Sequence, residues 1–338
     1  MVALYVTSLE RGSGKTAIGA GLGKHLLGDG KKAGFFKPII ASKKNLPMEE
    51  ANSDATLIKD LFALDEPADL LCPILSDEGN LTGRIKEAYA KVSRDKDVVI
   101  VEGVSDQNQA TRTIVAALDA RVIFIEGYSK ELLKAIHSYH DFGEHLLGLV
   151  LNKVPRNRVE YLRSETPAHL DKAGVNILGI LPEERALFAL TVGELAEHIQ
   201  GEILSGADKS AELVENLMLG ALCVDPGPEY YGRKNNKTAV VRSDRPDMQL
   251  AALETSTRCL VLTGNTAIKP VVLERAEAKG VPIILARDDT TAVVTAIEDA
   301  LIKSRFSQEK LPKLTEIMEQ HFDFQAVYKG LGLARGNL

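Results

Sequence analysis

The sequence predicts an α/β protein with a doubly wound, mostly parallel sheet in its first unit and a second, smaller α/β unit behind it. Short apolar runs alternate with longer helical patterns along the first two hundred residues. Most of these runs are continuously apolar, as in parallel strands that helices cover on both faces. A shorter series of the same kind follows, and a length of 338 residues suits two domains.

The elements of the first unit follow in order from these patterns. The expected strands cover residues 3–7, 33–39, 97–103, 121–127, 146–154 and 177–183. Helical patterns lie between them at residues 16–30, 54–64, 81–95, 129–143 and 159–174, and several of them end in glycine, which favours a helix C-terminus. The alternation predicts ligands at the carboxyl ends of the strands.

The second unit has its own series of strands and helices. Strands are expected at residues 238–244, 259–265 and 281–289, and helices at residues 246–256, 269–280 and 290–301. The polar, glycine-containing stretch 199–210 is typical of a linker. We therefore predict domains at residues 1–205 and 210–303, followed by a helical tail at 304–338.

Composition narrows the classes of function and compartment. The net charge of −6 argues against a nucleic-acid-binding surface, although Arg11, Lys15 and Lys37 could form a local basic patch. Three widely spaced cysteines lack metal or redox spacing, which favours a reduced, cytoplasmic compartment. No targeting signal and no run of about 18 apolar residues is visible, so no membrane span is expected.

The stretch "ALYVTSLERGSGKT" carries the strongest functional signal. Glycines such as Gly12 and Gly14 let backbone N–H groups surround phosphate oxygens without a Cβ in the way. Lys15 would reach the β- and γ-phosphates, and the Thr16 hydroxyl would bind Mg²⁺. The strict pattern has glycine where this chain has Leu9, and a glycine-rich turn with a surface lysine is the alternative. The predicted nucleotide-binding residues of the loop are Glu10, Arg11, Gly12, Ser13, Gly14, Lys15, Thr16 and Ala17.

Polar residues at three other places could complete such a site. Glu102 ends a buried strand, where an acid beside Mg²⁺ is expected, although it could also face solvent. Asp54 is a second candidate metal ligand, and capping of the helix that follows would equally explain it. Asn152 suits hydrogen bonding to an adenine edge while the Lys153 stem packs on the ring, or both form a plain strand-end turn.

The order and spacing of these motifs resemble the dethiobiotin synthetase branch of the deviant P-loop ATPases. The resemblance rests on "VTSLERGSGKT", "FFKPI", "NSDA", "IVEG", "LVLNKV" and "ILGILPE". It implies a P-loop NTPase domain with Lys15 and Lys37 as catalytic residues, Lys37 lying beside the substrate. It also implies that Thr16, Asp54 and Glu102 hold magnesium. A cation at Lys37 would neutralise a carbamate or a transferring γ-phosphate, and a strand-end lysine before Pro38 is the alternative.

The sequence departs from that family in the substrate half of the site. These ligases follow the strand-end acid with a Gly-Gly pair, whereas Glu102 and Gly103 continue here as Val104, Ser105 and Asp106. Ala41 stands where a serine is expected, and Ser42 follows it. ATP binding fits these changes better than dethiobiotin synthesis does.

The second unit resembles a DRTGG domain, and its "SDRPDMQ" stretch matches the naming motif only in Asp244 and Arg245. A synthetase-like ATPase followed by a DRTGG domain is the architecture of the amino-terminal half of long phosphotransacetylases. Polar strand ends at 244–245, 263–265 and 288–290 could form a ligand site, and ordinary turn and cap chemistry is the alternative.

Three hypotheses for function follow. The first is a cytoplasmic, Mg²⁺-dependent ATP-binding protein, with Glu10 or Asp106 as candidates to orient water, that couples nucleotide state to a partner enzyme of acyl-phosphate metabolism. The second is an ATP-dependent ligase for a small carboxylate or carbamate, and the third a non-catalytic nucleotide-sensing module. The resemblance implies a homodimer.

Overall fold

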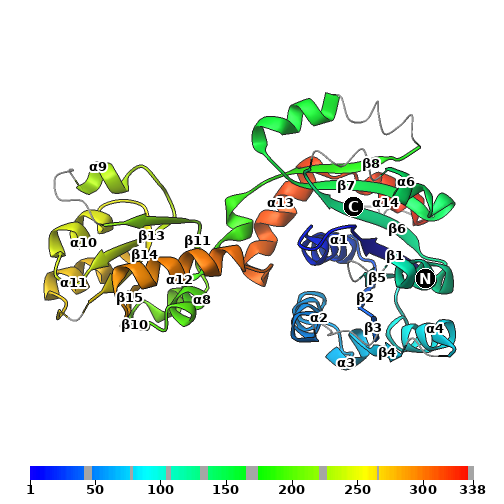
Figure 1. Cartoon of the computed structure of the whole chain (residues 1–338), viewed down its shortest axis with the longest axis horizontal. Coiled ribbons are helices and arrows are strands. Elements are labelled where there is room, and N and C mark those ends of the chain that lie inside the picture. The colour runs from blue at the N-terminus through cyan, green and yellow to red at the C-terminus, as the bar shows by residue number, and fades with distance from the viewer. Residues whose placement is uncertain are drawn as a thin grey trace. The chain divides into compact units, whose positions relative to one another are not determined.

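The computed structural model describes residues 1–41, 48–76, 79–103, 108–129, 136–164, 174–220, 227–264 and 266–333. It divides into two compact units (Figure 1), the first comprising residues 1–183 and 311–338 and the second residues 184–310. The sequence placed the first boundary at 205 and a separate tail at 304–338. The structure differs because residues 184–205 belong to the second unit, while residues 311–338 return to the first.

The first unit is built on a six-stranded parallel sheet of order β2-β5-β1-β6-β7-β8. Its strands are β1 (Val2–Thr7), β2 (Ala33–Phe36), β5 (Val98–Glu102), β6 (Arg121–Gly127), β7 (Leu146–Val154) and β8 (Ile177–Pro182). Each lies within or overlaps an apolar run that the sequence identified, and the doubly wound α/β class is confirmed. A separate parallel pair joins β3 (Ile39–Ala41) to β4 (Ile74–Ser76).

Helices of the first unit lie on both faces of this sheet. They are α1 (Lys15–Gly28), α2 (Met48–Phe62), α3 (Ala68–Leu71), α4 (Leu81–Val92), α5 (Asn108–Leu118), α6 (Ile136–His140), α13 (Leu311–His321) and α14 (Phe324–Gly330). The last two, red in Figure 1, pack on α1, β7 and β8. A Cβ on Gly21 of α1 would lie 2.3 Å from the Met318 sulfur, so a small residue permits this close packing.

The second unit contains a mixed five-stranded sheet of order β10-β15-β14-β13-β12. The strands of this sheet are β10 (Glu202–Ser205), β12 (Asn216–Leu219), β13 (Lys237–Arg242), β14 (Thr257–Thr263) and β15 (Ile283–Leu285). A separate antiparallel pair joins β9 (Leu190–Thr191) to β11 (Leu213–Val214). The helices of this unit are α8 (Val192–His198), α9 (Gly227–Tyr231), α10 (Pro246–Leu253), α11 (Pro270–Lys279) and α12 (Thr290–Ile302). Buried clusters cover both faces of the five-stranded sheet.

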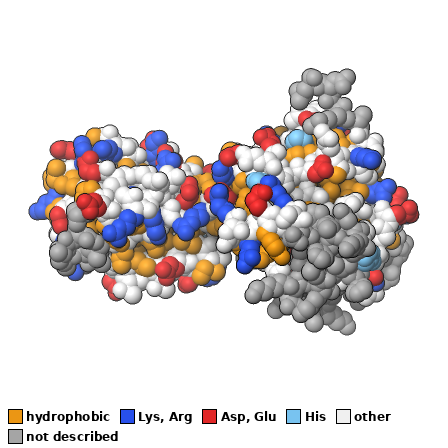
Figure 2. Space-filling model, turned by 90° about the horizontal axis from the view of Figure 1, so that it is seen from above, with side chains coloured by type: hydrophobic (Ala, Val, Ile, Leu, Met, Phe, Trp, Pro, Cys, Tyr) orange, Lys and Arg blue, Asp and Glu red, His pale blue; other side chains and the backbone are white. Residues whose placement is uncertain are grey.

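Charged side chains of both signs lie on the surface of each unit, as Figure 2 shows from one side. Several are paired, for example Arg275 with Glu254 and Arg258 with Glu212. Within the described ranges, no helix combines the length and the apolar character needed to cross a membrane.

Candidate functional site

The candidate site lies at the carboxyl end of β1, the central strand from which the first sheet extends in both directions. Strand β1 pairs with β5 on one side and with β6 on the other, both in parallel. In such sheets the loops that leave the carboxyl ends of the central strands open a crevice that accepts ligands. The loop after β1, residues 8–14, therefore starts between the ends of β5 and β6 and leads directly into α1.

The backbone of the loop has the conformation that its glycines allow. Gly12 and Gly14 have φ angles of 72° and 99°, which L side chains rarely adopt. A Cβ on Gly14 would lie 2.4 Å from Nδ2 of Asn152, so this glycine is also needed for space. Lys15, the first residue of α1, follows directly, and the first amides of a helix favour an anion.

Strand β7 supports the loop from one side. Asn152 is buried, and its Nδ2 donates a hydrogen bond of 2.8 Å to the Ser13 carbonyl. Lys153 has a positive φ of 57°, and its Nζ donates to the Gly12 carbonyl at 2.7 Å. Both side chains thus hold the loop in this structure. The contact with adenine that the sequence suggested for them stays a prediction.

The two polar side chains at the start of α1 are also engaged. Lys15 Nζ donates to Ser8 Oγ at 2.9 Å, and Ser8 Oγ donates to the Glu10 carbonyl at 2.6 Å. Thr16 Oγ1 donates to Oε1 of Glu102 at 3.0 Å. The Ser13 hydroxyl is buried and has no hydrogen-bond partner among the residues that the structure describes, which is costly unless a ligand supplies one.

A buried cation links the predicted metal ligands. Lys37 Nζ lies 2.5 Å from Oδ2 of Asp54 and 2.6 Å from Oε1 of Glu102. Burial lowers the pKa of Lys37, but the two carboxylates outweigh burial, and its pKa is raised above the ordinary value. The structure therefore brings together Thr16, Lys37, Asp54 and Glu102, as the sequence suggested.

The structure removes the simpler explanations for Asp54 and Glu102, whereas Lys37 does lie at a strand end before Pro38. Asp54 lies inside α2, which begins at Met48, so it does not cap that helix. Glu102 is 3% exposed and Lys37 is 7% exposed, so neither faces solvent. Within the described part of the chain, Glu102 Oε2 is buried without a hydrogen-bond partner, so this carboxylate oxygen could bind a ligand.

Glu126, at the end of β6, was missed by the sequence reasoning. Its Oε1 accepts a 2.8 Å hydrogen bond from the Leu9 amide, at the position where the strict loop pattern has glycine. The side chain is 5% exposed, and burial raises the pKa of Glu126 to about 7. The sequence did hold a signal, because "VIVEG" and "IFIEG" end two strands with the same Glu-Gly pair.

The remaining loop residues differ in burial. Glu10 and Arg11 are exposed, and Ala17 is half-buried in the first turn of α1. Asp106, Ser42 and Asn265, which the sequence analysis named, lie outside the described residues.

In the second unit, the polar strand ends are occupied mainly by local chemistry. Arg242 pairs with Asp244, and Arg245 pairs with Asp247, whose pKa this guanidinium lowers. Asp289 caps α12 by accepting from the Ala292 amide at 2.9 Å. Turn and cap chemistry therefore accounts for Asp244 and Asp289.

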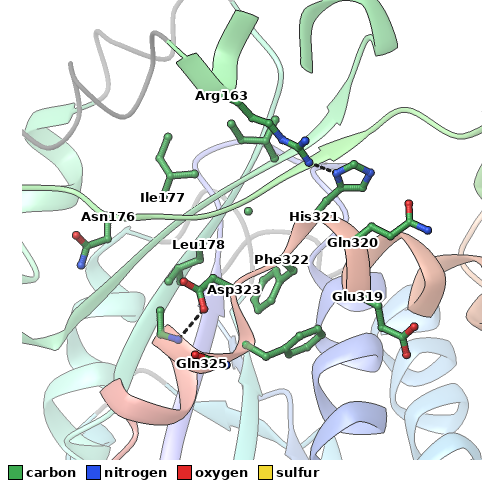
Figure 3. A pocket seen from close by; sticks show the side chains of 14 residues that line it. Arg163, Asn176, Ile177, Leu178, Glu319, Gln320, His321, Phe322, Asp323 and Gln325 are labelled. Carbon is green, nitrogen blue, oxygen red and sulfur yellow. Dashed lines mark hydrogen bonds between the residues drawn. The ribbon is translucent and has the colours of Figure 1, made fainter. Parts of the chain in front are cut away.

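A hollow of about 830 Å³ lies at the outer edge strand of the first sheet (Figure 3). Strand β8, the end of α13, the start of α14 and the connection between these helices form most of its lining. Arg163 and His321 point toward one another across it. Burial, with the charges of Arg163 and Arg156, lowers the pKa of His321. Of the described residues, those lining this hollow include none from the loop, Lys37, Asp54 or Glu102.

Comparison with known proteins agrees with this two-part organisation. A family described as "AAA domain" matches residues 2–190, and one described as "DRTGG domain" matches residues 194–300. Phosphate acetyltransferase of Pseudomonas aeruginosa is 24% identical over 99% of this chain and 53% of its own length. The chain thus spans about half the length of that relative.

Two further matches each cover about half of this chain. ATP-dependent dethiobiotin synthetase of Bacillus velezensis is 22% identical over 54% of this chain and 87% of its own length. Among solved structures, the MinC:MinD cell division protein complex of Aquifex aeolicus contains a chain that matches 55% of this one and 84% of its own length. That match has 17% identity and a TM-score of 0.39.

Proposed function

Because the chain belongs to the AAA-domain family of P-loop proteins and carries a DRTGG domain after it, we propose that its first unit binds ATP with Mg²⁺ and hydrolyses it. The second unit is then regulatory. The observation that carries this proposal is the convergence of three features at one sheet edge: the loop glycines, Lys15 and the buried pair of Lys37 with Glu102.

The chain offers a suitable donor set for magnesium. Mg²⁺ prefers oxygen ligands and is usually held by one or two carboxylates together with substrate phosphates. Thr16 Oγ1, Asp54 and Glu102 supply such oxygens, and no described residue forms a hydrogen bond with the buried Glu102 Oε2. Magnesium bound here would neutralise charge on the phosphates, and these three residues would hold it.

The residues of the chain have separate parts in ATP binding. The loop amides and Lys15 would hold the phosphates, because they are the donors at the start of α1. Asn152 and Lys153, at the end of β7, stabilise the conformation of the loop through hydrogen bonds to its backbone carbonyls. If Mg²⁺ takes over the carboxylates, Lys37 is released to a second anion, either the transferring phosphate or a substrate.

A ligase acting on a small carboxylate or carbamate is the second candidate. The observation in its favour is Lys37, a buried cation placed next to the proposed metal ligands and not in the loop itself. Such a cation suits an acyl-phosphate intermediate as well as a hydrolysed phosphate. ATP turnover that requires a small carboxylic acid, or CO₂ with an amine, would favour this candidate.

The whole-protein role is proposed from the relatives. The match to phosphate acetyltransferase of Pseudomonas aeruginosa covers nearly the full chain, so we propose that the protein couples nucleotide state to an enzyme of acyl-phosphate metabolism. We also propose a homodimer, which light scattering with and without nucleotide would test.

Calorimetric titration with ATP and Mg²⁺, with phosphate release followed in the same samples, tests the proposed function. Wild type should bind and slowly release phosphate, and Lys15→Ala should lose both. Lys24→Ala, at an exposed position further along α1, is the matched control and should bind as wild type does. Binding without release would favour a nucleotide-sensing module, and absence of binding would contradict the proposal.

A further inference from the structure

Two glutamates end the strands on either side of β1, and their surroundings differ. Glu102 on β5 is paired with Lys37 and Thr16, whereas Glu126 on β6 is hydrogen-bonded to a loop amide. Glu126 is nearly as buried as Glu102. A buried carboxylate beside a phosphate-binding loop is unexpected, because its charge repels the anion that the loop accepts.

Among the described residues, the titratable and charged groups that act on Glu126 come from two directions. From the loop and the start of α1, the Glu10 carboxylate disfavours its ionisation, while the Lys15 ammonium and the Leu9 N–H favour it. From α6, Tyr139 faces it, and burial together with the charges of Glu126 and Glu10 raises the pKa of that phenol. Tyr139 therefore stays neutral across the physiological range.

We propose that Glu126 is a positioning residue of the phosphate loop: it fixes the start of the loop through the Leu9 amide, and its charge state sets how tightly the loop accepts phosphate. The effect of the Glu126 charge on phosphate affinity rests on the proposed ATP binding. The positioning of the loop through the Leu9 amide concerns the nucleotide-free protein and does not depend on it. Leu9 lacks the freedom of the glycine in the strict pattern, and the bond to Glu126 supplies a fixed conformation in its place.

The pH dependence follows from the surroundings of Glu126. Burial raises its pKa to about 7, and arriving phosphates raise it further because like charges disfavour ionisation. Below pH 7 the group is neutral with or without nucleotide, so affinity is highest and independent of this group. Above pH 7 binding takes up a proton, and affinity falls by up to about tenfold per pH unit until the pKa of the nucleotide complex is reached.

The first experiment follows the loop without nucleotide. Hydrogen exchange of the peptide containing Leu9 should show a protected amide in wild type and in Glu126→Gln, whose amide oxygen still accepts the bond. Glu126→Ala should lose that protection. Rapid exchange of Leu9 in wild type, or unchanged protection in Glu126→Ala, would overturn the positioning role.

The second experiment titrates Mg-ATP by calorimetry from pH 6 to 8.5. Wild type should lose affinity above pH 7, whereas Glu126→Gln should bind like wild type at pH 6 and more tightly at pH 8.5. Glu319→Gln, an exposed carboxylate on α13, should keep the wild-type profile. Ionisation of ATP itself affects all variants equally.

The outcomes separate the two proposals. Equal pH profiles for wild type and Glu126→Gln would overturn the role of charge in binding. A wild type that binds no nucleotide at any pH would contradict the proposed function and, with it, the charge dependence, while Leu9 exchange would still decide the positioning role.

Discussion

Replacing Lys37 by methionine tests whether the buried cation organises the site. The change keeps most of the side-chain volume but removes the ammonium that lies 2.5 Å from Asp54 and 2.6 Å from Glu102. Glu102 would be left 3% exposed with an unpaired charge. Removing one partner of a buried ion pair typically costs about 3–5 kcal/mol, because the remaining charge keeps its desolvation penalty.

This cost converts into a measurable change in melting temperature. For a domain of roughly 200 residues, 1 kcal/mol shifts Tm by about 2–4 °C, so Lys37→Met should lower the Tm of the first unit by about 6–20 °C. Differential scanning calorimetry measures this shift, and far-UV circular dichroism can follow urea unfolding in a chain without tryptophan. Mg²⁺ should recover more stability in the variant than in wild type, since it can replace the lost cation.

A surface pair provides the control. Lys91 lies 3.3 Å from Glu87 on α4, and their side chains are 53% and 73% exposed. Lys91→Met should therefore cost less than about 0.5 kcal/mol. A loss below about 1 kcal/mol for Lys37→Met would refute the reasoning, because it would mean that the two carboxylates turn to solvent and are not held by the ammonium.

Three further predictions concern the loop, the metal ligand and the second unit. Gly14→Ala should abolish Mg-ATP binding and cost about 1–3 kcal/mol in urea unfolding, because its φ of 99° is strained for alanine. Adding Asn152→Ala relieves the contact at 2.4 Å but not that strain, so rescue should be partial; full rescue would contradict the strain argument. Thr16→Val should weaken Mg²⁺-dependent ATP binding at least about tenfold in calorimetry, because valine has nearly the shape of threonine but lacks the hydroxyl that would bind the metal. Unchanged Mg²⁺ dependence would exclude that role for Thr16. Burial lowers the pKa of Lys237 to about 8, so above that pH the unfolded chain binds more protons at this lysine than the folded chain does. The free energy of unfolding, measured by urea titration, should therefore rise from about pH 8 to 9, and Lys237→Met should reduce this increase.

The first sheet was predictable because its strands are buried on both faces. Each therefore has a nearly continuous apolar run, a signal that needs no knowledge of its neighbours. The domain boundary depends on packing between distant segments. Helix α13 belongs to the first unit because its Met318 fits over Gly21 of α1, and nothing local in either sequence indicates that contact.

The beginning of α2 shows how a local rule is overridden. Aspartate before an apolar helical pattern favours an N-cap, so the sequence suggested a helix starting at Asp54. The structure starts the helix at Met48 and places Asp54 in its interior, where the side chain pairs with Lys37. The ion pair with a residue from another segment gives Asp54 a role that capping preferences cannot predict.

Residue types in the site were predictable, but their partners were not. The loop, Lys37 and Glu102 follow from motifs whose chemistry requires those residues. The amide of Asn152 donates to the Ser13 carbonyl, a partner that the strand-end motif does not specify, and its contact with an adenine edge stays a prediction. A sequence motif specifies which group is available at a strand end, whereas the partner depends on which loop folds over it.

The two Glu-Gly strand ends have similar sequences but different surroundings in the fold. Glu102 and Glu126 follow similar apolar runs, so a reading by pattern alone gives them the same role. Glu102 has a cation and a hydroxyl within hydrogen-bonding distance, an environment that suits an ionised metal ligand. Burial, together with the Glu10 carboxylate, raises the pKa of Glu126 to about 7, although the hydrogen bond from the Leu9 amide lowers it. The chemistry of each glutamate is therefore set by the neighbours that its strand meets in the sheet, and Glu126 is the one poised to change its charge when phosphate arrives.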